Sequence, residues 1–177
     1  MLNTYYQVFE KALPSDFCDY IVKTTDWKSA QEAKVRRNGD ELDHTARISQ
    51  NIWADKNSPI GCVAQTYIGL ANRIWNYTLN RIEDIQMTEY KPKGHYDWHI
   101  DSFEPVNGEQ RKLSISILLN DEFIGGGLEI NGKFKESVLK SKGDIVVFPS
   151  FLSHRVVPVE LGTRYTAVSW AYGPAFR

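Results

Sequence analysis

The chain has 177 residues, of which 42% are hydrophobic and 24% charged, and its formal net charge is −1. This length suits a single domain with a sizeable core, and the composition is ordinary for a soluble globular protein. Because the net charge is close to zero, the protein has no overall positive field that would attract nucleic acid or an anionic membrane. Five Trp, nine Tyr and eight Phe favour a β-rich core or an aromatic-lined cavity.

The N-terminal segment, residues 1–14, has no basic stretch followed by an apolar run, so no secretory signal is predicted. No window approaches the length of apolar chain that a membrane helix needs. Cys18 and Cys62 fall within helical patterns, which favours reduced thiols over a disulfide. These features predict a cytoplasmic protein that does not enter a membrane.

The first half of the chain predicts mixed α and β structure. Residues 4–13 form the pattern of a strand, and Pro14-Ser15 then opens a helix over 15–26. Residues 28–54 suggest strands, joined by a polar loop with an Asn-Gly turn. We expect this loop, residues 36–46, to close over an extended substrate.

A long helix is predicted over 59–80. Ser58 supplies an N-cap and Pro59 a favourable first helical residue. Apolar residues then recur at helical spacing along one side, so this helix must pack against a flat surface.

The second half predicts short strands separated by turn residues. The expected strands are 85–91, 95–101, 112–120, 127–131, 133–138, 144–148, 153–158 and 164–172. Strands at this spacing are typical of a β-sandwich, jelly roll or barrel. The sequence therefore predicts one mainly β (α+β) domain over 1–177, in which 1–83 supports an all-β core at 84–177. The helices are expected to cover one outer face of the sheet.

Three residues suggest a metal site. His99 and Asp101 lie two apart on a predicted strand, so their side chains leave the same face. That pair alone is more typical of a surface contact. His154 follows a later strand and turn, and two imidazoles with one carboxylate form the facial set that leaves positions open on Fe(II). The same ligands could also hold zinc in a hydrolase.

Arg164 indicates what such open positions would serve. It shares the face of a predicted strand with Thr166, Val168 and Trp170. A cation on an inward, apolar face is unfavourable unless it meets an anion, and a guanidinium suits a carboxylate. An acidic residue of the chain could be that partner. Beside a metal site with open positions, a bound dicarboxylate explains Arg164 better.

The candidate residues occur in a recognisable order: Tyr90, His95, Tyr96, His99, Asp101, Gly126, Gly127, Leu128, Gly143, Asp144, Phe148, Pro149, His154, Arg164 and Trp170. Over residues 86–172 this order resembles the Fe(II)/2-oxoglutarate-dependent dioxygenases, and within them the prolyl-4-hydroxylase-like branch in its minimal bacterial or phage form. Residues 47–53 resemble the Arg-x5-Trp strand of these enzymes. The resemblance implies a double-stranded β-helix, a jelly-roll or cupin-like core, with N-terminal strands and two or three helices packed on one sheet.

The resemblance also implies roles for the candidate residues. His99, Asp101 and His154 would hold Fe(II), and Arg164 would bind the distal carboxylate of 2-oxoglutarate. The remaining residues of the co-substrate pocket would be Tyr90 and Thr166 as hydrogen-bond donors, with Leu118 and Leu128 as apolar walls.

Leu118 stands where some relatives have a co-substrate-binding Tyr, which gives the Tyr90 hydroxyl more weight here. Arg111 and Trp53 match positions that line the substrate entrance in relatives. Their structural alternatives are a solvated arginine at a strand end and a tryptophan of the core.

The implied reaction is hydroxylation of a C–H bond with O2, releasing succinate and CO2, with ascorbate as a supporting reductant. The expected target is a prolyl residue in a peptide or protein, and the expected state is a monomer or weak dimer. A hydroxylase of free amino acids or small molecules is one alternative, and a non-catalytic cupin-like binding domain is another. A nucleic-acid demethylase is disfavoured, because no second arginine follows Arg164 at the spacing of those enzymes and the chain is not basic.

Overall fold

The computed structural model describes residues 5–36, 40–130 and 137–176, and its main sheet runs through the whole molecule. In spatial order the strands of this eight-stranded sheet are β1 (Gln7–Phe9), β13 (Ile145–Pro149), β10 (Glu109–Leu118), β16 (Arg164–Pro174), β8 (Ile85–Tyr90), β6 (Gln50–Ala54) and β2 (Gln31–Glu32), with β7 (Arg81–Ile82) paired to β16. All of its pairings are antiparallel.

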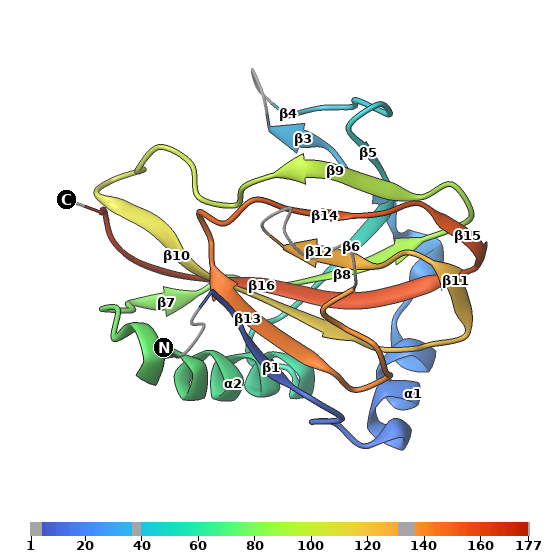
Figure 1. The fold of residues 1–177 in the computed structure, drawn as a ribbon, viewed down its shortest axis with the longest axis horizontal. Helices are drawn as coiled ribbons and strands as arrows, with labels where there is room; N and C mark the ends of the chain where they lie inside the picture. Colours follow the sequence, from blue (N-terminus) through green and yellow to red (C-terminus); the bar gives the residue numbers. More distant parts are fainter. Residues whose placement is uncertain (1–4, 37–39, 131–136, 177) are drawn as a thin grey trace.

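A smaller sheet lies over one face of the main sheet (Figure 1). This minor sheet has the order β12 (Leu128–Ile130), β14 (His154–Val156), β9 (His95–His99) and β5 (Arg47–Ile48). Two further pairs are β11 (Phe123–Gly125) with β15 (Val159–Gly162), and β3 (Val35–Arg36) with β4 (Asp40–Glu41). Two facing antiparallel sheets connected in this way form the predicted double-stranded β-helix.

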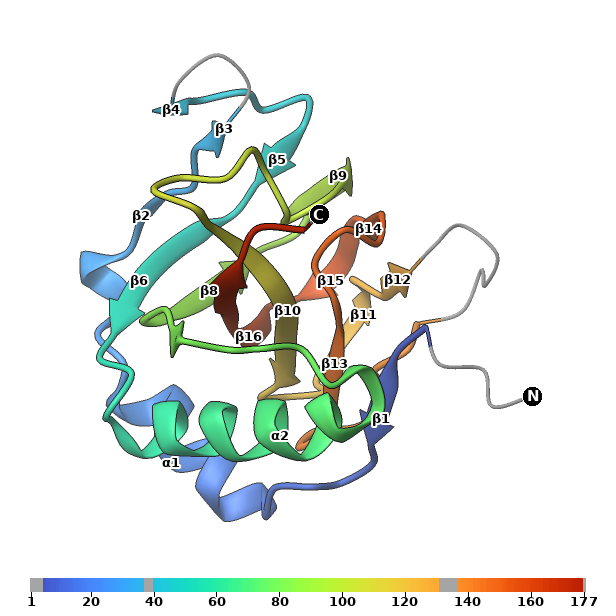
Figure 2. The same ribbon diagram turned by 90° about the vertical axis from the view of Figure 1, so that its left-hand side faces the viewer.

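Two α-helices cover the opposite face of the main sheet (Figure 2). They are α1 (Ser15–Thr24) and α2 (Pro59–Trp75), and a single 3-10 turn, η1, covers Trp27–Ser29. The hydroxyl of Ser58 accepts from Gly61 N at 3.4 Å and caps α2 as predicted. Within the described part of the chain, neither helix is long and apolar enough to cross a membrane.

Both helices end earlier than predicted. The chain becomes extended at Thr25 after α1, and Asn76 after α2 adopts a left-handed conformation with φ 53°. The Asn72 side chain then accepts from Tyr77 N at 3.0 Å. This left-handed C-cap redirects the chain toward β7, so residues 76–80 are not helical.

Two apolar clusters hold the layers together. The larger lies between the helices and the main sheet and includes Cys18, Ile21, Ile60, Ala64, Ile68, Ile85, Met87, Leu113, Ile115, Ile117, Ile145 and Val147. The smaller lies between the two sheets and includes Tyr90, Leu118, Leu128, Ile130, Val146, Phe148 and Val156. On β13 of the main sheet, for example, Ile145 and Val147 belong to the larger cluster and Val146 and Phe148 to the smaller, as the two-residue period of a strand requires.

Several predicted strands need correction. The strand predicted over 4–13 is reduced to β1, and the strand predicted over 47–53 is two strands that belong to different sheets. Arg47 and Ile48 pair with β9, whereas Gln50–Ala54 pair with β8, so the chain passes between sheets at Ser49. Most of the strand predicted over 133–138, and the turn at 37–39 in the predicted closing loop, lie outside the described residues.

Candidate active site

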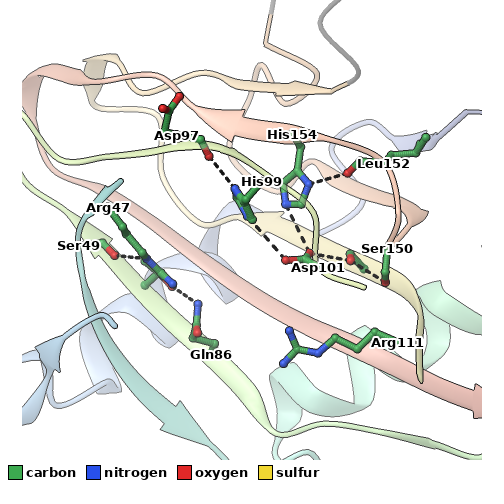
Figure 3. Close-up of polar contacts among 12 residues, drawn as sticks. Arg47, Ser49, Gln86, Asp97, His99, Asp101, Arg111, Ser150, Leu152 and His154 are labelled. Carbon is green, nitrogen blue, oxygen red and sulfur yellow. Dashed lines mark hydrogen bonds and ion pairs between the residues drawn. The ribbon is translucent and has the colours of Figure 1, made fainter. Parts of the chain in front are cut away.

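His99, Asp101 and His154 come together between the two sheets (Figure 3). His99 ends β9, Asp101 lies just beyond it, and His154 begins β14 directly opposite His99. One ligand atom from each residue lies within 4.8 Å of the others. The distances to the Asp101 carboxylate are 3.6 Å from His99 Nε2 and 3.4 Å from His154 Nε2.

Backbone carbonyl groups fix the orientation of both imidazoles. His99 Nδ1 lies 2.8 Å from the carbonyl oxygen of Asp97, and His154 Nδ1 lies 3.0 Å from that of Leu152 (Figure 3). With Nδ1 donating in each ring, both Nε2 atoms are free acceptors directed at the same point. This carbonyl contact is the usual outer support of a metal-binding histidine.

The Asp101 carboxylate is held from the main sheet. Ser114 on β10 donates its hydroxyl to Asp101 Oδ2 at 2.7 Å, and the Ser150 hydroxyl lies 2.9 Å from that of Ser114. The backbone N–H of Asp101 also donates to the Ser150 carbonyl oxygen. These contacts fix the carboxylate before any cation binds.

The protonation states also suit a cation. Burial lowers the pKa of His99 to about 3, aided by His154 and opposed by Asp101, so its imidazole is neutral at physiological pH. Burial alone would raise the pKa of Asp101, but the neighbouring His154 and His99 lower it below its usual value. A neutral imidazole and an ionised carboxylate, the forms of His99 and Asp101, are donor forms that suit Fe(II).

Arg164 lies in the same cavity and has no anionic partner among the described residues. It begins β16 opposite Tyr90, only 2% of its surface is exposed, and its Cζ lies 5.4 Å from the Tyr90 ring centre. Burial lowers the pKa of Arg164 to about 10, partly opposed by Tyr90, so the guanidinium remains charged at neutral pH. A buried charge of this kind is stable only when an anion joins it.

A cavity of about 300 Å³ connects Arg164 with the three metal-binding candidates. Tyr90, Thr166 and Leu128 line this central cavity together with Phe148 and Val156. Leu118 lies in the apolar cluster with Tyr90 and Leu128, and it lines a second cavity that also includes Arg164 in its lining. Of the co-substrate residues predicted from the sequence, Tyr90, Thr166 and Leu128 thus share the central cavity with Arg164, and Leu118 shares the second cavity with it.

Arg111 and Trp53 both line the central cavity. Arg111 Nη2 forms an ion pair with Glu83 at 2.8 Å, and its Cζ lies 3.8 Å from the Trp170 ring centre. Burial alone would lower the pKa of Arg111, but Glu83 raises it. Trp53 is 52% exposed, so it is not a core residue, and Arg111 is not a solvated strand end.

Tyr96 belongs to the family order recognised in the sequence, but sequence reasoning gave it no role in the site. Its ring stacks on the His99 imidazole with centres 3.5 Å apart. Residues three apart on a regular strand face opposite sides, but β9 has an irregularity: His99 pairs with His154, and Tyr96 with Val156. The extra residue in β9 puts Tyr96 and His99 on one face, which strand parity does not reveal.

Arg47 also lines the cavity, beside Tyr96. In the sequence it was noted only within the segment 47–53, as part of a presumed continuous strand. An arginine near a strand end is usually solvated, and nothing in the local pattern separates this one from that case.

Residues 85–172 match the sequence profile of the 2OG-Fe(II) oxygenase superfamily. A PKHD-type hydroxylase of Synechococcus elongatus is 33% identical over 138 residues, covering 72% of this chain and 62% of that protein. A putative prolyl 4-hydroxylase of Acanthamoeba polyphaga mimivirus is 29% identical over 150 residues, covering 72% and 59%. The chain thus spans about three fifths of the length of these curated relatives.

Solved structures show the same fold. A Pseudomonas putida prolyl-4-hydroxylase superposes with a TM-score of 0.76 at 22% identity, covering 97% of this chain and 94% of the other. A Trichoplax adhaerens prolyl hydroxylase, in complex with a hypoxia inducible factor peptide, gives 0.72 at 18% identity, covering 96% and 84%.

Proposed function

Because the chain belongs to the 2OG-Fe(II) oxygenase superfamily and is prolyl-4-hydroxylase-like, we propose that it hydroxylates a prolyl residue in a peptide or protein. The reaction would consume 2-oxoglutarate and O2 and release succinate and CO2. One observation carries this proposal: a single cavity holds both a His–Asp–His donor set and the buried Arg164, which has no anionic partner among the described residues.

The donor set fits Fe(II). Three protein ligands on one side of a metal leave the other side open for a chelating co-substrate and for dioxygen. His99, Asp101 and His154 supply those ligands, with both imidazoles already oriented by backbone carbonyl groups. When bound, Fe(II) with 2-oxoglutarate supplies the oxidising chemistry that inserts one oxygen atom into a C–H bond.

The residues around Arg164 fit a dicarboxylate. Its guanidinium would bind the distal carboxylate of 2-oxoglutarate with two hydrogen bonds, which would satisfy a charge that has no partner within the described chain. The Thr166 and Tyr90 hydroxyl groups would donate to the same carboxylate. Leu128 and Leu118 would exclude water on either side of Arg164.

The open side of the cavity would receive the substrate. Trp53 offers an exposed aromatic surface there, and the Glu83 ion pair holds the Arg111 guanidinium in place over Trp170. The likeness to a structure of a prolyl hydroxylase in complex with a peptide supports an extended peptide as the substrate. We assign Trp53 and Arg111 to substrate positioning.

The proposal is tested by measuring succinate formed from 2-oxoglutarate with Fe(II) and ascorbate, in the presence of a proline-containing peptide library. Mass spectrometry of the peptides should find products that have gained one oxygen atom at proline. His154→Ala serves as the control that should form neither product.

The outcomes separate the alternatives. Succinate coupled to a free amino acid or another small molecule, with no response to peptides, would identify a small-molecule hydroxylase. Absence of succinate under all conditions, together with binding of metal, would identify a non-catalytic binding domain. Arg164 argues against a non-catalytic binding domain, because a domain that only binds a metal does not need a buried cation beside the metal site.

A further inference from the structure

The charges that line the central cavity do not balance. In the described part of the chain these charged side chains are Lys34, Arg47, Glu83, Asp101, Arg111 and Arg164. Glu83 neutralises Arg111, and Asp101 with Arg164 would balance Fe(II) and the dicarboxylate of the proposed function. Among the charged side chains that line the cavity and that the structure describes, Lys34 and Arg47 are two cations left without an anion.

Arg47 is the more informative of the two because it is buried. Only 6% of its surface is exposed. Its Nε donates to Ser49 Oγ at 2.8 Å and its Nη2 to Asn51 Oδ1 at 3.2 Å, while its Cζ lies 4.5 Å from the Tyr96 ring centre. All of these partners are neutral, and no described carboxylate lies within ion-pair distance of Arg47.

Other arginines of this protein show the contrast. Arg155 also lies over an aromatic ring, with its Cζ 4.8 Å from the Trp98 ring centre, but its Nε meets Glu129 at 2.8 Å. Arg81 lies over Tyr172 and meets Glu109 at 3.0 Å. Arg47 is thus more buried than either and lacks the carboxylate that both have, and a buried cation without an anion is unfavourable.

The position of Arg47 limits where its anion can come from. The centre of the Tyr96 ring lies 3.5 Å from the centre of the His99 ring and 4.5 Å from Arg47 Cζ. Arg47 Cζ therefore lies no more than 8.0 Å from the centre of the His99 ring. An extended peptide advances about 3.3–3.6 Å per residue. In an extended peptide whose reacting residue lies at the metal site, a side chain that contacts Arg47 therefore belongs to a residue about two positions away.

We infer that the substrate carries a carboxylate within about two residues of the hydroxylated residue, and that Arg47 binds this carboxylate as a specificity-determining residue. The exposed Lys34 adds positive potential at the cavity mouth. The inference rests on the proposed function and narrows its substrate class. A neutral backbone carbonyl would leave the Arg47 charge uncompensated, which is why an acidic group is assigned.

The test uses matched proline peptides with blocked termini. Glu is placed at successive positions on either side of the proline, and each peptide is compared with its Gln counterpart. A peptide with a free C-terminal carboxylate, and a free amino acid against its amide, distinguish a side-chain acid from a terminal one. At the preferred position the acid should lower KM by about 10- to 100-fold relative to the amide.

Variants assign that preference to Arg47. In Arg47→Gln the acid and amide peptides should have equal KM, because the cation that distinguishes them is gone. Arg47→Lys keeps the charge without the planar fork and should retain part of the preference. Arg155→Gln, in the same minor sheet but outside the cavity, should retain all of it.

Equal turnover of every acid and amide pair would overturn the inference while leaving the proposed function intact, and so would an acid preference that survives in Arg47→Gln. If no peptide yields succinate, the proposed function fails. Binding of the same peptides, measured by isothermal titration with the unaltered protein and Arg47→Gln, then decides the Arg47 assignment separately.

Discussion

The two faces of the main sheet are built from the same strands and are both buried, but only the face toward the minor sheet combines apolar residues with buried polar and charged ones. On β10, Leu113, Ile115 and Ile117 belong to the cluster under the helices, while Ser114 and Ser116 alternate with them on the cavity side. On β16, Ala167 and Ala171 likewise face the helices, and Arg164, Thr166 and Trp170 face the cavity.

This difference separates stability from function within single strands. Burial of apolar side chains on the helix face stabilises the fold. The cavity face buries hydroxyl groups and charges, which lower the stability of the free protein unless ligands satisfy them. Substitutions on the helix face should therefore lower stability, whereas substitutions on the cavity face should lower ligand binding and activity.

The largest effect is expected from His154→Ala on the cavity face. Loss of a ligand should reduce iron affinity by more than the ~10- to 100-fold that loss of an outer supporting contact costs, and hydroxylation should vanish. Iron binding is measured by isothermal titration with 2-oxoglutarate present. His95→Ala is the matched control: His95 lies on β9 with His99, and its side-chain hydrogen bonds within the described residues are to the backbone carbonyls of Lys93 and Thr45. Retained iron affinity in His154→Ala would remove this residue from the site.

Arg164→Met should weaken 2-oxoglutarate binding by about 30-fold or more, since loss of one partner of a buried charged contact costs roughly 2–5 kcal/mol. The melting temperature without ligand should be unchanged or higher, because the variant removes an unpaired buried charge. The contrasting control is Arg111→Met, which leaves Glu83 without its partner. It should melt at lower temperature with nearly unchanged 2-oxoglutarate affinity. Unchanged affinity in Arg164→Met would contradict the assignment of the co-substrate anchor.

Ile117→Ala tests the opposite face. Ile117 is 1% exposed, so its truncation should leave a cavity and lower the free energy of unfolding by about 2–5 kcal/mol. Affinity for 2-oxoglutarate should be unchanged while the protein is folded. Urea denaturation measures the first quantity and isothermal titration the second. Ser116→Ala, the neighbour on the cavity face, should change stability less than Ile117→Ala does. A reversed ranking would show that the two faces do not divide the roles.

The same two faces explain how much the sequence alone could predict. The alternation of apolar and polar residues on β10 and β16 indicated strands, and the Ser58-Pro59 pair located the start of α2. Arg164 was detectable because a charge is conspicuous on an otherwise apolar strand. The second histidine of the metal set, His154, was detectable because a polar residue is unexpected after the apolar strand and turn at 144–153, and the family resemblance then gave it the role of a ligand.

The features that escaped prediction depend on tertiary structure. The irregularity in β9 that brings Tyr96 onto His99 is set by pairing with β14, and the local sequence does not reveal it. The pairing of Glu83 with Arg111 joins residues that are far apart in the chain. Arg47 lines the cavity because it pairs with the minor sheet, whereas the chain joins the main sheet after Ser49. The sequence pattern indicated a single strand here.

The smallest effect is expected in the labelling of the two cysteines, of which one lies in the core and the other at the surface. Cys18 lies in the cluster under the main sheet, and burial raises the pKa of its thiol to about 11, although Lys142 lowers it in part. Cys62 is exposed. Only a thiolate attacks an alkylating reagent, so at about pH 8, well below the pKa of Cys18, iodoacetamide should label Cys62 and spare Cys18.

Mass spectrometry of the native protein should find a single labelled cysteine, and in urea both should react. Ile117→Ala should increase the rate at which Cys18 reacts, because weaker packing on the helix face opens this core more often. Arg164→Met should not increase it, because the removed charge lies on the cavity face. Rapid labelling of Cys18 in the native protein would mean that the helix face is loosely packed, and the division of roles between the two faces would then fail.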